Sequence, residues 1–423
     1  MKIPYGKTMI DINLDVASVE SILPNVHVQS PLSEDQIVLD AMASPINSPT
    51  LQSLAEGKRD AVIIISDHTR PVPSKYMIPH MLKELRDGNP DIEIKLLVAT
   101  GCHRGTTKYE LINKLGEKIV ENEEIIIHDC LLEEEMIDMG ELPSGARLII
   151  NEAAINTDLL IAEGFIEPHF FAGFSGGRKS VLPGVCSRNT VLGNHCSQFI
   201  ESEYARAGIL ENNPIQTDML AACKMVNLQY ILNVIINSEK QIVSAYAGNP
   251  FVAHEKGCEE LLKSCCVTPE KKGDIVIVSN GGAPLDQNVY QAVKGLSTAE
   301  AAAEEGAVLI ICAECADGIG GDDFYDSLSG CISAEELFER VLKVPMNQTR
   351  PDQWQYQILA RILIKHHVIF VTRPELKEVI QDMKMEYAAD IDQALEKAWE
   401  IKGKECHHVV IPDGISVIIT EHN

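Results

Sequence analysis

The chain has 423 residues, 45% of them hydrophobic, and a formal net charge of −26 from 36 Lys and Arg against 62 Asp and Glu. This length predicts two or three domains, each with a sizeable core. The acidic balance argues against nucleic acid or an anionic membrane as a partner. It does not exclude an anionic substrate, because a few cationic groups can dominate a cleft locally.

The beginning of the chain and its cysteines favour a cytoplasmic protein. The segment MKIPYGKTMIDINL has no apolar signal-peptide core, and no run approaches the roughly 18 apolar residues of a membrane helix. The 12 cysteines are scattered along the chain, which is typical of reduced thiols. We therefore expect a soluble protein that works in the cytoplasm.

Short apolar, β-branched runs alternate along the chain with longer helical patterns. Strands are predicted at 61–66, 94–100, 124–128, 158–163, 230–236, 274–279, 307–313, 368–372 and 408–411. Helices are predicted at 75–87, 107–121, 250–265, 288–304, 333–342, 353–366 and 388–401. Most strand segments are continuously apolar, as in parallel strands that helices cover on both faces. The pattern predicts an α/β protein with two domains, mostly parallel sheets and an active site in the cleft between them.

A polar segment at 268–273, TPEKKG, predicts the boundary between the domains. An N-terminal α/β domain, assigned to cofactor binding, would span 1–268, and a C-terminal α/β domain would span 274–400. The closing strands within 403–423 suit either domain and could complete the first one.

Four unusual polar clusters each follow a predicted strand directly. They are Asp67–Pro71, Gly101–Arg104, Phe165–His169 and Gly281–Gln287. In open α/β sheets, ligands bind outside the carboxyl ends of the strands. We therefore expect these loops to converge on one crevice.

The segment 163–184, EGFIEPHFFAGFSGGRKSVLPG, is the richest in groups that could bind an anion. Gly176 and Gly177 let the backbone approach a ligand and present N–H groups, and Arg178 and Lys179 add charge. A P-loop would require Gly where Arg178 stands. A phosphate cradle of another kind and a glycine-rich structural turn both remain open. Lys179 suits a phosphate counterion or a nucleophile, because a desolvated lysine beside an arginine has a lowered pKa.

Three histidines and one arginine are further candidates. His103, His169 and His195 lie in or near glycine-rich loops, which favours function over packing. None belongs to a short metal motif, so a metal would need ligands distant in sequence or a cofactor. Arg70 suits a bidentate grip on a phosphate or a carboxylate.

A predicted helix begins just after the fourth polar cluster. Tyr290 and Lys294 share a face near its start, beside Gln291, where an anion is favoured. An ordinary exposed face is an equally good interpretation. Trp354 lies in another predicted helix, where core packing is its default interpretation.

With these residues assembled, the chain resembles the nickel-pincer lactate racemase family over essentially its whole length. The resemblance is carried by SDHTRPVP (66–73), VATGCHR (98–104), EPHFFAGFSGGRKSVLPG (167–184), GNHC (193–196), PLDQNVYQAVKG (284–295) and PDQWQ (351–355). It implies a cofactor, the nickel(II) pyridinium-3,5-bisthiocarboxylate mononucleotide, or nickel-pincer nucleotide.

The resemblance also implies roles for individual residues. Lys179 would be joined covalently to the cofactor, His195 would bind the nickel, and His103 and His169 would be the two acid–base residues. The cofactor-binding wall would include Asp67, His68, Thr69 and Arg70, with Gly176 and Gly177 beside it. The substrate would contact Tyr290, Gln291, Lys294, Trp354 and Arg70.

The implied reaction interconverts D- and L-lactate, or a closely related small 2-hydroxy acid. A histidine takes the hydroxyl proton while hydride moves to the pyridinium ring, and a 2-keto acid forms before hydride returns to its other face. The implied partners are the 2-hydroxy acid and the proteins that synthesise the cofactor.

Three alternatives remain. Cys102 and Ala283 depart from the family pattern, which would suit a racemase or epimerase of a larger 2-hydroxy acid. A non-catalytic relative that binds a nucleotide is a second alternative, although the retained histidines and Lys179 argue against it. An NAD-dependent dehydrogenase lacks support, because no G-x-G-x-x-G follows a strand at the start of a βαβ unit.

Overall fold

The computed structural model describes residues 1–14, 18–23, 30–237 and 239–421. Its contacts divide the chain into two compact units. Unit 1 comprises Met1–Asn25, His195–Glu203 and Cys265–Asn423, and unit 2 comprises Val26–Asn194 and Tyr204–Ser264. Each unit contains a six-stranded sheet with helices, which confirms the predicted α/β class with two domains.

The two units are not separated by a single boundary along the chain. The chain crosses from unit 2 to unit 1 near residue 265, and both ends of the chain belong to unit 1. The N-terminal strand β3 (Val19–Ser21) pairs with β19 (His408–Ile411), and β14 (Cys266–Val267) pairs with β20 (Ile418–Ile419). Strand pairing across the whole length of the chain therefore builds unit 1.

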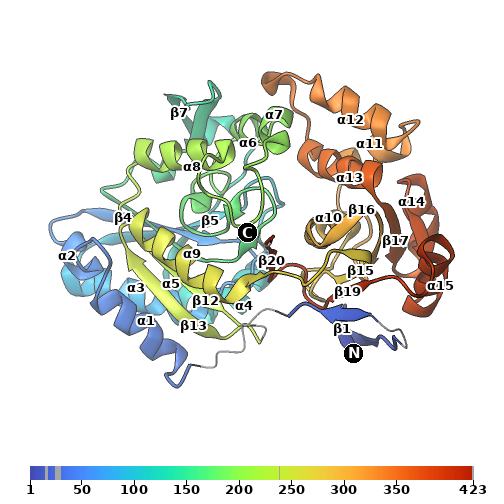
Figure 1. Cartoon of the computed structure of the whole chain (residues 1–423). Coiled ribbons are helices and arrows are strands. Elements are labelled where there is room, and N and C mark those ends of the chain that lie inside the picture. The colour runs from blue at the N-terminus through green and yellow to red at the C-terminus, as the bar shows by residue number, and fades with distance from the viewer. Residues whose placement is uncertain (15–17, 24–29, 238, 422–423) are drawn as a thin grey trace. The chain divides into compact units, whose positions relative to one another are not determined.

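The sheet of unit 2 has the strand order β13-β12-β9-β4-β5-β6 (Figure 1). All neighbours are parallel except β12 and β13, which are antiparallel. The bounds are β4 (Asp60–Ser66), β5 (Glu93–Ala99), β6 (Glu124–Ile127), β9 (Leu159–Phe165), β12 (Tyr230–Ile236) and β13 (Ile242–Gly248). The interior strands are buried almost throughout, as continuous apolar runs predict.

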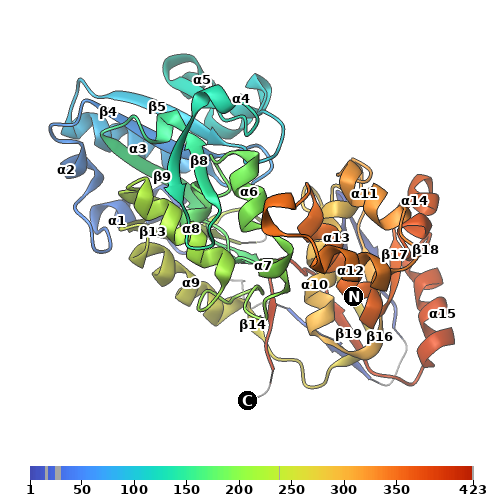
Figure 2. The same ribbon diagram turned by 90° about the horizontal axis from the view of Figure 1, so that it is seen from above.

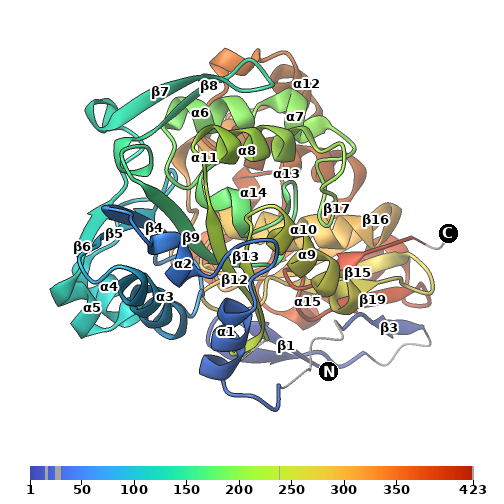
Figure 3. The ribbon, with the colours of Figure 1, turned by 90° about the vertical axis from the view of Figure 1, so that its left-hand side faces the viewer.

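Helices of unit 2 pack on this sheet and on one another. Helices α1 and α3 contact each other, and α3 also contacts β9 (Figure 3). The helices are α1 (Glu34–Ala43), α2 (Leu51–Ala55), α3 (Ser74–Gly88), α4 (Lys108–Leu115), α5 (Glu117–Asn122), α6 (Arg188–Asn194), α8 (Pro214–Met225) and α9 (Val252–Cys265). The 107–121 prediction is one helix, but the structure divides it because Gly116 adopts φ +89° between α4 and α5.

The sheet of unit 1 has the order β18-β17-β16-β15-β19-β3, and all neighbours are parallel. Its remaining strands are β15 (Gly273–Ser279), β16 (Ala303–Cys312), β17 (His367–Val371) and β18 (Glu386–Ala388). Its helices are α7 (Ser197–Glu201), α10 (Val289–Ala301), α11 (Asp322–Ser329), α12 (Ala334–Leu342), α13 (Gln353–Lys365), α14 (Lys377–Asp382) and α15 (Ile391–Lys402). Helices α10 and α15 both contact β15 and β16, and Figure 2 shows them on opposite sides of the strands.

Four two-stranded sheets complete the described structure. They include β1 (Lys2–Tyr5) with β2 (Thr8–Asp11), β7 (Met136–Glu141) with β8 (Arg147–Asn151), and β10 (Pro168–His169) with β11 (Gly173–Phe174). None of the helices in the described ranges has the length and apolar character that crossing a bilayer requires.

Candidate active site

Three of the four predicted polar clusters follow β4, β5 and β9, which are neighbours in the sheet of unit 2. Since these strands are parallel, their loops leave the same edge of the sheet. Unit 2 therefore brings together the residues that follow Ser66, Ala99 and Phe165. The fourth cluster follows β15 and belongs to unit 1.

Asp67, directly after β4, orients His103 from the neighbouring loop. Its Oδ2 atom lies 2.8 Å from His103 Nδ1, and its Oδ1 atom accepts hydrogen bonds from the Thr69 hydroxyl (2.7 Å) and backbone N–H (3.2 Å). Burial alone would raise the pKa of Asp67. The hydrogen bond and charge of His103, the charge of Arg70 and the Thr69 hydrogen bond together outweigh it and lower the pKa to about 2.

The contact with Asp67 also assigns the tautomer of His103. An ionised carboxylate only accepts hydrogen bonds, so His103 Nδ1 carries the proton that is donated to it. The Nε2 atom of the neutral ring then carries the lone pair that a general base requires. The His103 side chain is 40% exposed, so this ring can meet a ligand.

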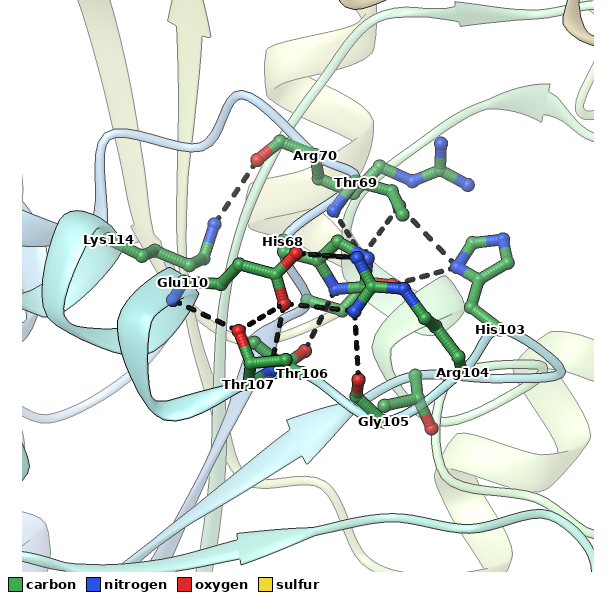
Figure 4. A network of polar contacts seen from close by, with 12 residues as sticks. His68, Thr69, Arg70, His103, Arg104, Gly105, Thr106, Thr107, Glu110 and Lys114 are labelled. Atoms are coloured by element: carbon green, nitrogen blue, oxygen red, sulfur yellow. Dashed lines mark hydrogen bonds and ion pairs between the residues drawn. The ribbon is translucent and has the colours of Figure 1, made fainter. Parts of the chain in front are cut away.

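His68 lies beside a second polar network (Figure 4). Its Nδ1 atom is 3.1 Å from the Thr106 hydroxyl, and its Nε2 atom is 3.9 Å from Glu110 Oε1. Burial lowers the pKa of His68, and the neighbouring carboxylates only partly oppose this effect. Glu110 and Thr107 form a capping box at the start of α4, and the sequence motif T-x-x-E could have revealed it.

Two side chains outside the predicted set fix the loop that carries Asp67 and Arg70. Lys114 Nζ donates to the backbone oxygens of Arg70 (3.2 Å) and Val72 (3.4 Å), as Figure 4 shows for Arg70. At the base of the same loop, Glu163 Oε1 accepts from the Ser66 backbone N–H (3.1 Å), the Ser66 hydroxyl (3.1 Å) and the Ser74 hydroxyl (2.9 Å). No motif in the sequence predicts the contacts of either residue, because both contacts join segments that are distant along the chain.

His169 and Lys179 converge within the glycine-rich segment. Lys179 Nζ lies 3.2 Å from His169 Nε2, and the His169 ring packs against Phe170 and Phe171. The backbone N–H of Ala172 donates to His169 Nδ1 (3.3 Å). His169 thus accepts a backbone hydrogen bond at Nδ1, and its Nε2 atom faces the lysine.

Gly176 and Gly177 allow close packing of the loop. The sequence predicted instead that they present N–H groups to an anion. Both have positive φ, +74° and +51°, and a Cβ on Gly177 would lie 2.6 Å from the His254 ring. The Gly177 N–H donates to Asn233 Oδ1 (2.8 Å), so Asn233 already occupies it. The expectation that this N–H faces an anion is therefore wrong, and the reason is a buried asparagine from β12.

Arg178 also differs from its expected place beside a ligand. It is 2% exposed and donates to the backbone oxygens of Ala172 (2.6 Å) and Gly176 (3.4 Å) and to Gln216. Burial lowers its pKa to about 10. Arg178 thus anchors the loop from within the core, and only Lys179 of this pair is oriented toward the histidine.

Backbone hydrogen bonds join the His103 loop to the Lys179 segment. The Gly101 N–H donates to Gly184 O (2.9 Å), and the Gly184 N–H donates to Lys179 O (3.2 Å). His103, His169 and Lys179 consequently belong to one hydrogen-bonded framework in unit 2.

Unit 1 carries the remaining predicted residues. His195 is 4% exposed, and its ring packs edge-on against Trp354 with 5.0 Å between centroids. Gln357 Nε2 donates to Ser197 O (3.0 Å), which ties α13 to the segment that follows His195. Trp354 therefore packs against His195. The interpretation of Trp354 as a core residue did not predict this contact.

Tyr290, Gln291 and Lys294 lie half-buried on the first turns of α10. The side chain of Asn288 caps this helix by accepting from Gln291 N (2.9 Å). The Tyr290 ring packs edge-on against Phe324, and its backbone oxygen accepts from Gln355, the neighbour of Trp354. The predicted substrate residues of unit 1 thus lie in the first turns of two adjoining helices, α10 and α13.

The imidazole of His195, the candidate metal ligand, is buried. Across the described ranges, no group of three or more His, Cys, Asp or Glu side chains is arranged to bind a metal ion. A metal bound through His195 would need its other ligands from a cofactor. The residues therefore fit a group that brings its own donor atoms.

The fold and these residues define a two-unit α/β protein in which one histidine, His103, contacts a buried carboxylate and another, His169, lies beside a lysine. The profile of the lactate racemase N-terminal domain matches residues 5–208, and that of the lactate racemase C-terminal domain matches residues 268–419. The chain belongs to the lactate racemase family.

Individual relatives agree with this assignment over nearly their whole lengths. The lactate racemase of Thermoanaerobacterium thermosaccharolyticum is 50% identical over 423 residues, covering 100% of this chain and 99% of that protein. The lactate racemase of Lactiplantibacillus plantarum is 46% identical over 419 residues and 99% of each chain. The structure of the T. thermosaccharolyticum lactate racemase apoprotein matches with a TM-score of 0.93 over 99% of both chains. A Thermotoga maritima protein, 18% identical with a TM-score of 0.69 over 95% of this chain and 100% of that one, shares the fold.

Proposed function

We propose that this protein interconverts D- and L-lactate with a nickel-pincer nucleotide attached to Lys179. The observation that carries this proposal is a pair of oriented histidines, His103 against the Asp67 carboxylate and His169 beside Lys179. Racemisation requires one group that takes a proton and another that gives one, and the roles exchange when the reaction reverses. The relatives named as lactate racemases supply the substrate.

The two histidines move the proton of the substrate hydroxyl. His103 Nε2 accepts that proton from one enantiomer, and Asp67 stabilises the imidazolium that results. His169 Nε2 donates a proton when the other enantiomer forms. The cycle runs in reverse with the same two atoms, so neither direction needs a further acid or base.

Charged and polar side chains hold the carboxylate of the substrate. Arg70, Gln291 and Lys294 are assigned to it, because guanidinium, amide and ammonium groups donate hydrogen bonds to a carboxylate. Tyr290 and Trp354 supply apolar surface for the substrate. Fixing the carboxylate lets the reacting carbon change its configuration while the acid stays bound.

Eight residues are assigned to the cofactor. Lys179 would carry the covalent link, and its Nζ atom lies 3.2 Å from His169 Nε2. His195 would ligate the nickel, and Asp67, His68, Thr69 and Arg70 would line the nucleotide. Gly176 and Gly177 would shape the loop behind Lys179. When bound, the group supplies the hydride acceptor that side chains lack.

The expected partners follow from this assignment. The protein would receive its nucleotide from cofactor-synthesis proteins and would act on a small 2-hydroxy acid in the cytoplasm. A larger 2-hydroxy acid is the alternative substrate, and the exposed Cys102 is one of the two positions that suggest it. The small side chain of Ala283 is the other feature that would enlarge the substrate pocket.

The test is chiral chromatography of L-lactate incubated with protein that intact-mass spectrometry shows to carry the cofactor. Appearance of D-lactate, without release of NADH, supports the proposal. If loaded protein leaves L-lactate unchanged but racemises a longer 2-hydroxy acid, the substrate is that longer acid. Loaded protein that is inactive on both would indicate a non-catalytic relative.

A further inference from the structure

A buried carboxylate, Asp286, connects segments of unit 1 that are distant along the chain. It is 1% exposed and lies in the loop 280–288, which joins β15 to α10. Its Oδ2 atom accepts hydrogen bonds from the backbone N–H groups of Gly6 (2.6 Å) and Glu314 (3.1 Å). Gly6 lies in the turn between β1 and β2, and Glu314 follows β16. One oxygen atom therefore holds two remote segments against the loop that leads into α10.

Further hydrogen bonds join the N-terminal hairpin of β1 and β2 to the same loop. The Ala283 N–H donates to Gly6 O (2.8 Å), and the Ser279 hydroxyl donates to Pro4 O (2.5 Å). A Cβ on Gly282 would lie 3.0 Å from Gly6 O, so the two backbones are in close contact. The hairpin, whose strand β1 contacts β15 (Figure 1), thus supports the loop along its first half.

The segment after β16, residues 313–321, uses the first N–H groups of α10. The Val289 N–H donates to Gly318 O (3.1 Å), and the Tyr290 N–H donates to Ile319 O (2.9 Å). The first N–H groups of a helix have no partner within the helix, and they can bind an anion. Here they are bonded within the protein. A carboxylate beside this end of α10 therefore has to be bound by side chains, whose orientation then matters.

Asp286 contacts the segment 313–321 through its backbone as well as its side chain. The Cys315 N–H donates to Asp286 O (3.0 Å), beside the bond from the Glu314 N–H to the carboxylate. From the loop after β17, Thr372 Oγ1 donates to Glu314 O (3.1 Å). The segment that covers the start of α10 is consequently held from both sides, by Asp286 and by Thr372.

A second buried side chain makes the loop and α10 one unit. Asn280 is 0% exposed, its Nδ2 atom donates to Leu285 O (2.6 Å), and its Oδ1 atom accepts from the Gly295 N–H (3.0 Å). Leu285 precedes Asp286, and Gly295 follows Lys294. A displacement of the loop at Asp286 is therefore transmitted to the turn of α10 that carries Lys294.

We propose that Asp286 is a positioning residue for the substrate, because it fixes the orientation of Tyr290, Gln291 and Lys294 at the start of α10. This inference rests on the proposed function for the role of those three side chains. The carboxylate of a 2-hydroxy acid keeps its charge throughout racemisation, so contacts to it stabilise the bound acid and the transition state alike. Loss of such uniform binding raises KM and leaves kcat nearly unchanged.

The kinetic test compares two substitutions of Asp286 in cofactor-loaded protein. Asp286→Ala leaves two buried N–H groups without an acceptor, whereas Asp286→Asn keeps an oxygen atom that can accept from both. We expect D286A to raise the KM for L-lactate at least tenfold, with kcat within threefold of the parent and the Lys179 adduct intact. D286N should stay within threefold of the parent in both constants.

Asp274→Ala is the matched control, since Asp274 accepts from the His407 N–H (3.0 Å) at the opposite end of β15, and it should leave KM unchanged. A D286A protein with the parent KM, or with a fall in kcat larger than the rise in KM, would overturn the assignment. D286N as impaired as D286A would overturn it too.

Hydrogen exchange of the full-length chain without cofactor, read by mass spectrometry, tests the structural step. The peptide containing residues 286–294 should exchange at least tenfold faster in D286A than in the parent or D274A, while peptides of unit 2 stay unchanged. Thr372→Val removes one hydroxyl that holds the same segment, so it should act in the same direction and less strongly. T372V thus keeps the test open if D286A does not fold.

Unchanged exchange of residues 286–294 in every folded variant at Asp286 or Thr372, or equal acceleration of all peptides, would overturn the positioning role. Local acceleration supports it. Because exchange needs no turnover, it is measured even if the protein does not racemise lactate. Failure of this inference is therefore distinguishable from failure of the proposed function.

Discussion

Asp67 Oδ2 lies 2.8 Å from His103 Nδ1, and Asp67 is 1% exposed. A buried carboxylate in this position fixes both the orientation and the tautomer of the imidazole. The acid–base chemistry assigned to His103 therefore depends on a second residue that need not touch the substrate.

Replacing Asp67 by Asn should lower kcat on the order of 10²-fold, because the neutral amide neither fixes the tautomer nor stabilises the imidazolium. The measurement is the rate of D-lactate formation by variant protein with a verified cofactor adduct. Asp138→Asn is the matched control, since this exposed carboxylate pairs with Arg147 on the surface, and it should be neutral. Turnover of D67N within twofold of the parent would contradict the role.

The same carboxylate predicts how stability changes with pH. Because folding lowers the pKa of Asp67 from 3.8 to about 2, its contribution is present above pH 4 and is lost as pH falls toward 2. The full contribution is about 2 kcal/mol, and roughly half of it should be gone by pH 3. Urea unfolding of parent and D67N protein at pH 6 and pH 3 tests this. A difference between the two proteins that stays constant over this interval would refute it.

Much of the fold is predictable from local pattern. The continuous apolar runs at 61–66 and 230–236 coincide with β4 and β12, because parallel strands are buried on both faces. The edge strand β13 is missed, since its run IVSAYAG is half-exposed and carries polar residues. The short hairpin of β1 and β2 has no local signal strong enough to separate it from a loop.

The site is predictable only in part, because direction and pairing are tertiary properties. The sequence places Asp67, His103 and His169 at strand ends and Lys179 in a glycine-rich loop, but it cannot say that Asp67 contacts His103. Arg178 and Lys179 are adjacent cations in the sequence, yet one enters the core and the other faces His169. The supporting residue Asn233 comes from a strand that carries no motif.

Each histidine should be needed in both directions of the reaction. His103→Ala and His169→Ala should each lower kcat/KM by about 10²–10⁴-fold while the adduct on Lys179 remains in the mass spectrum. Since the two enantiomers have equal free energy, each variant must lose the same factor from L- and from D-lactate. A variant that racemises at the parent rate would remove that histidine from the mechanism.

Substitution of Arg178 should reduce the stability of the protein, whereas substitution of Lys179 should prevent attachment of the cofactor. Arg178→Met removes the buried guanidinium that donates to the backbone oxygens of Ala172 and Gly176 and to Gln216, and it should lower the free energy of unfolding by about 3 kcal/mol. Lys179→Met, at a half-buried site, should change stability little but abolish the adduct. Thermal unfolding and intact-mass spectra of both variants test this contrast. A persistent adduct in K179M, or an R178M protein as stable as the parent, would contradict the assignments.

His195 should be needed for nickel but not for the covalent link. Its imidazole is 4% exposed against Trp354, so it is held in place for a ligand instead of sampling solvent. His195→Ala should lower the nickel content of adduct-bearing protein at least tenfold, because one donor atom is lost from the metal. His367→Ala is the control in the same unit, since this half-exposed imidazole pairs with Glu386 and should leave the nickel content unchanged. Metal analysis and intact-mass spectrometry of the same sample test this prediction. Full nickel occupancy in H195A would show that another residue binds the metal. Loss of the adduct would show that His195 is needed for covalent attachment.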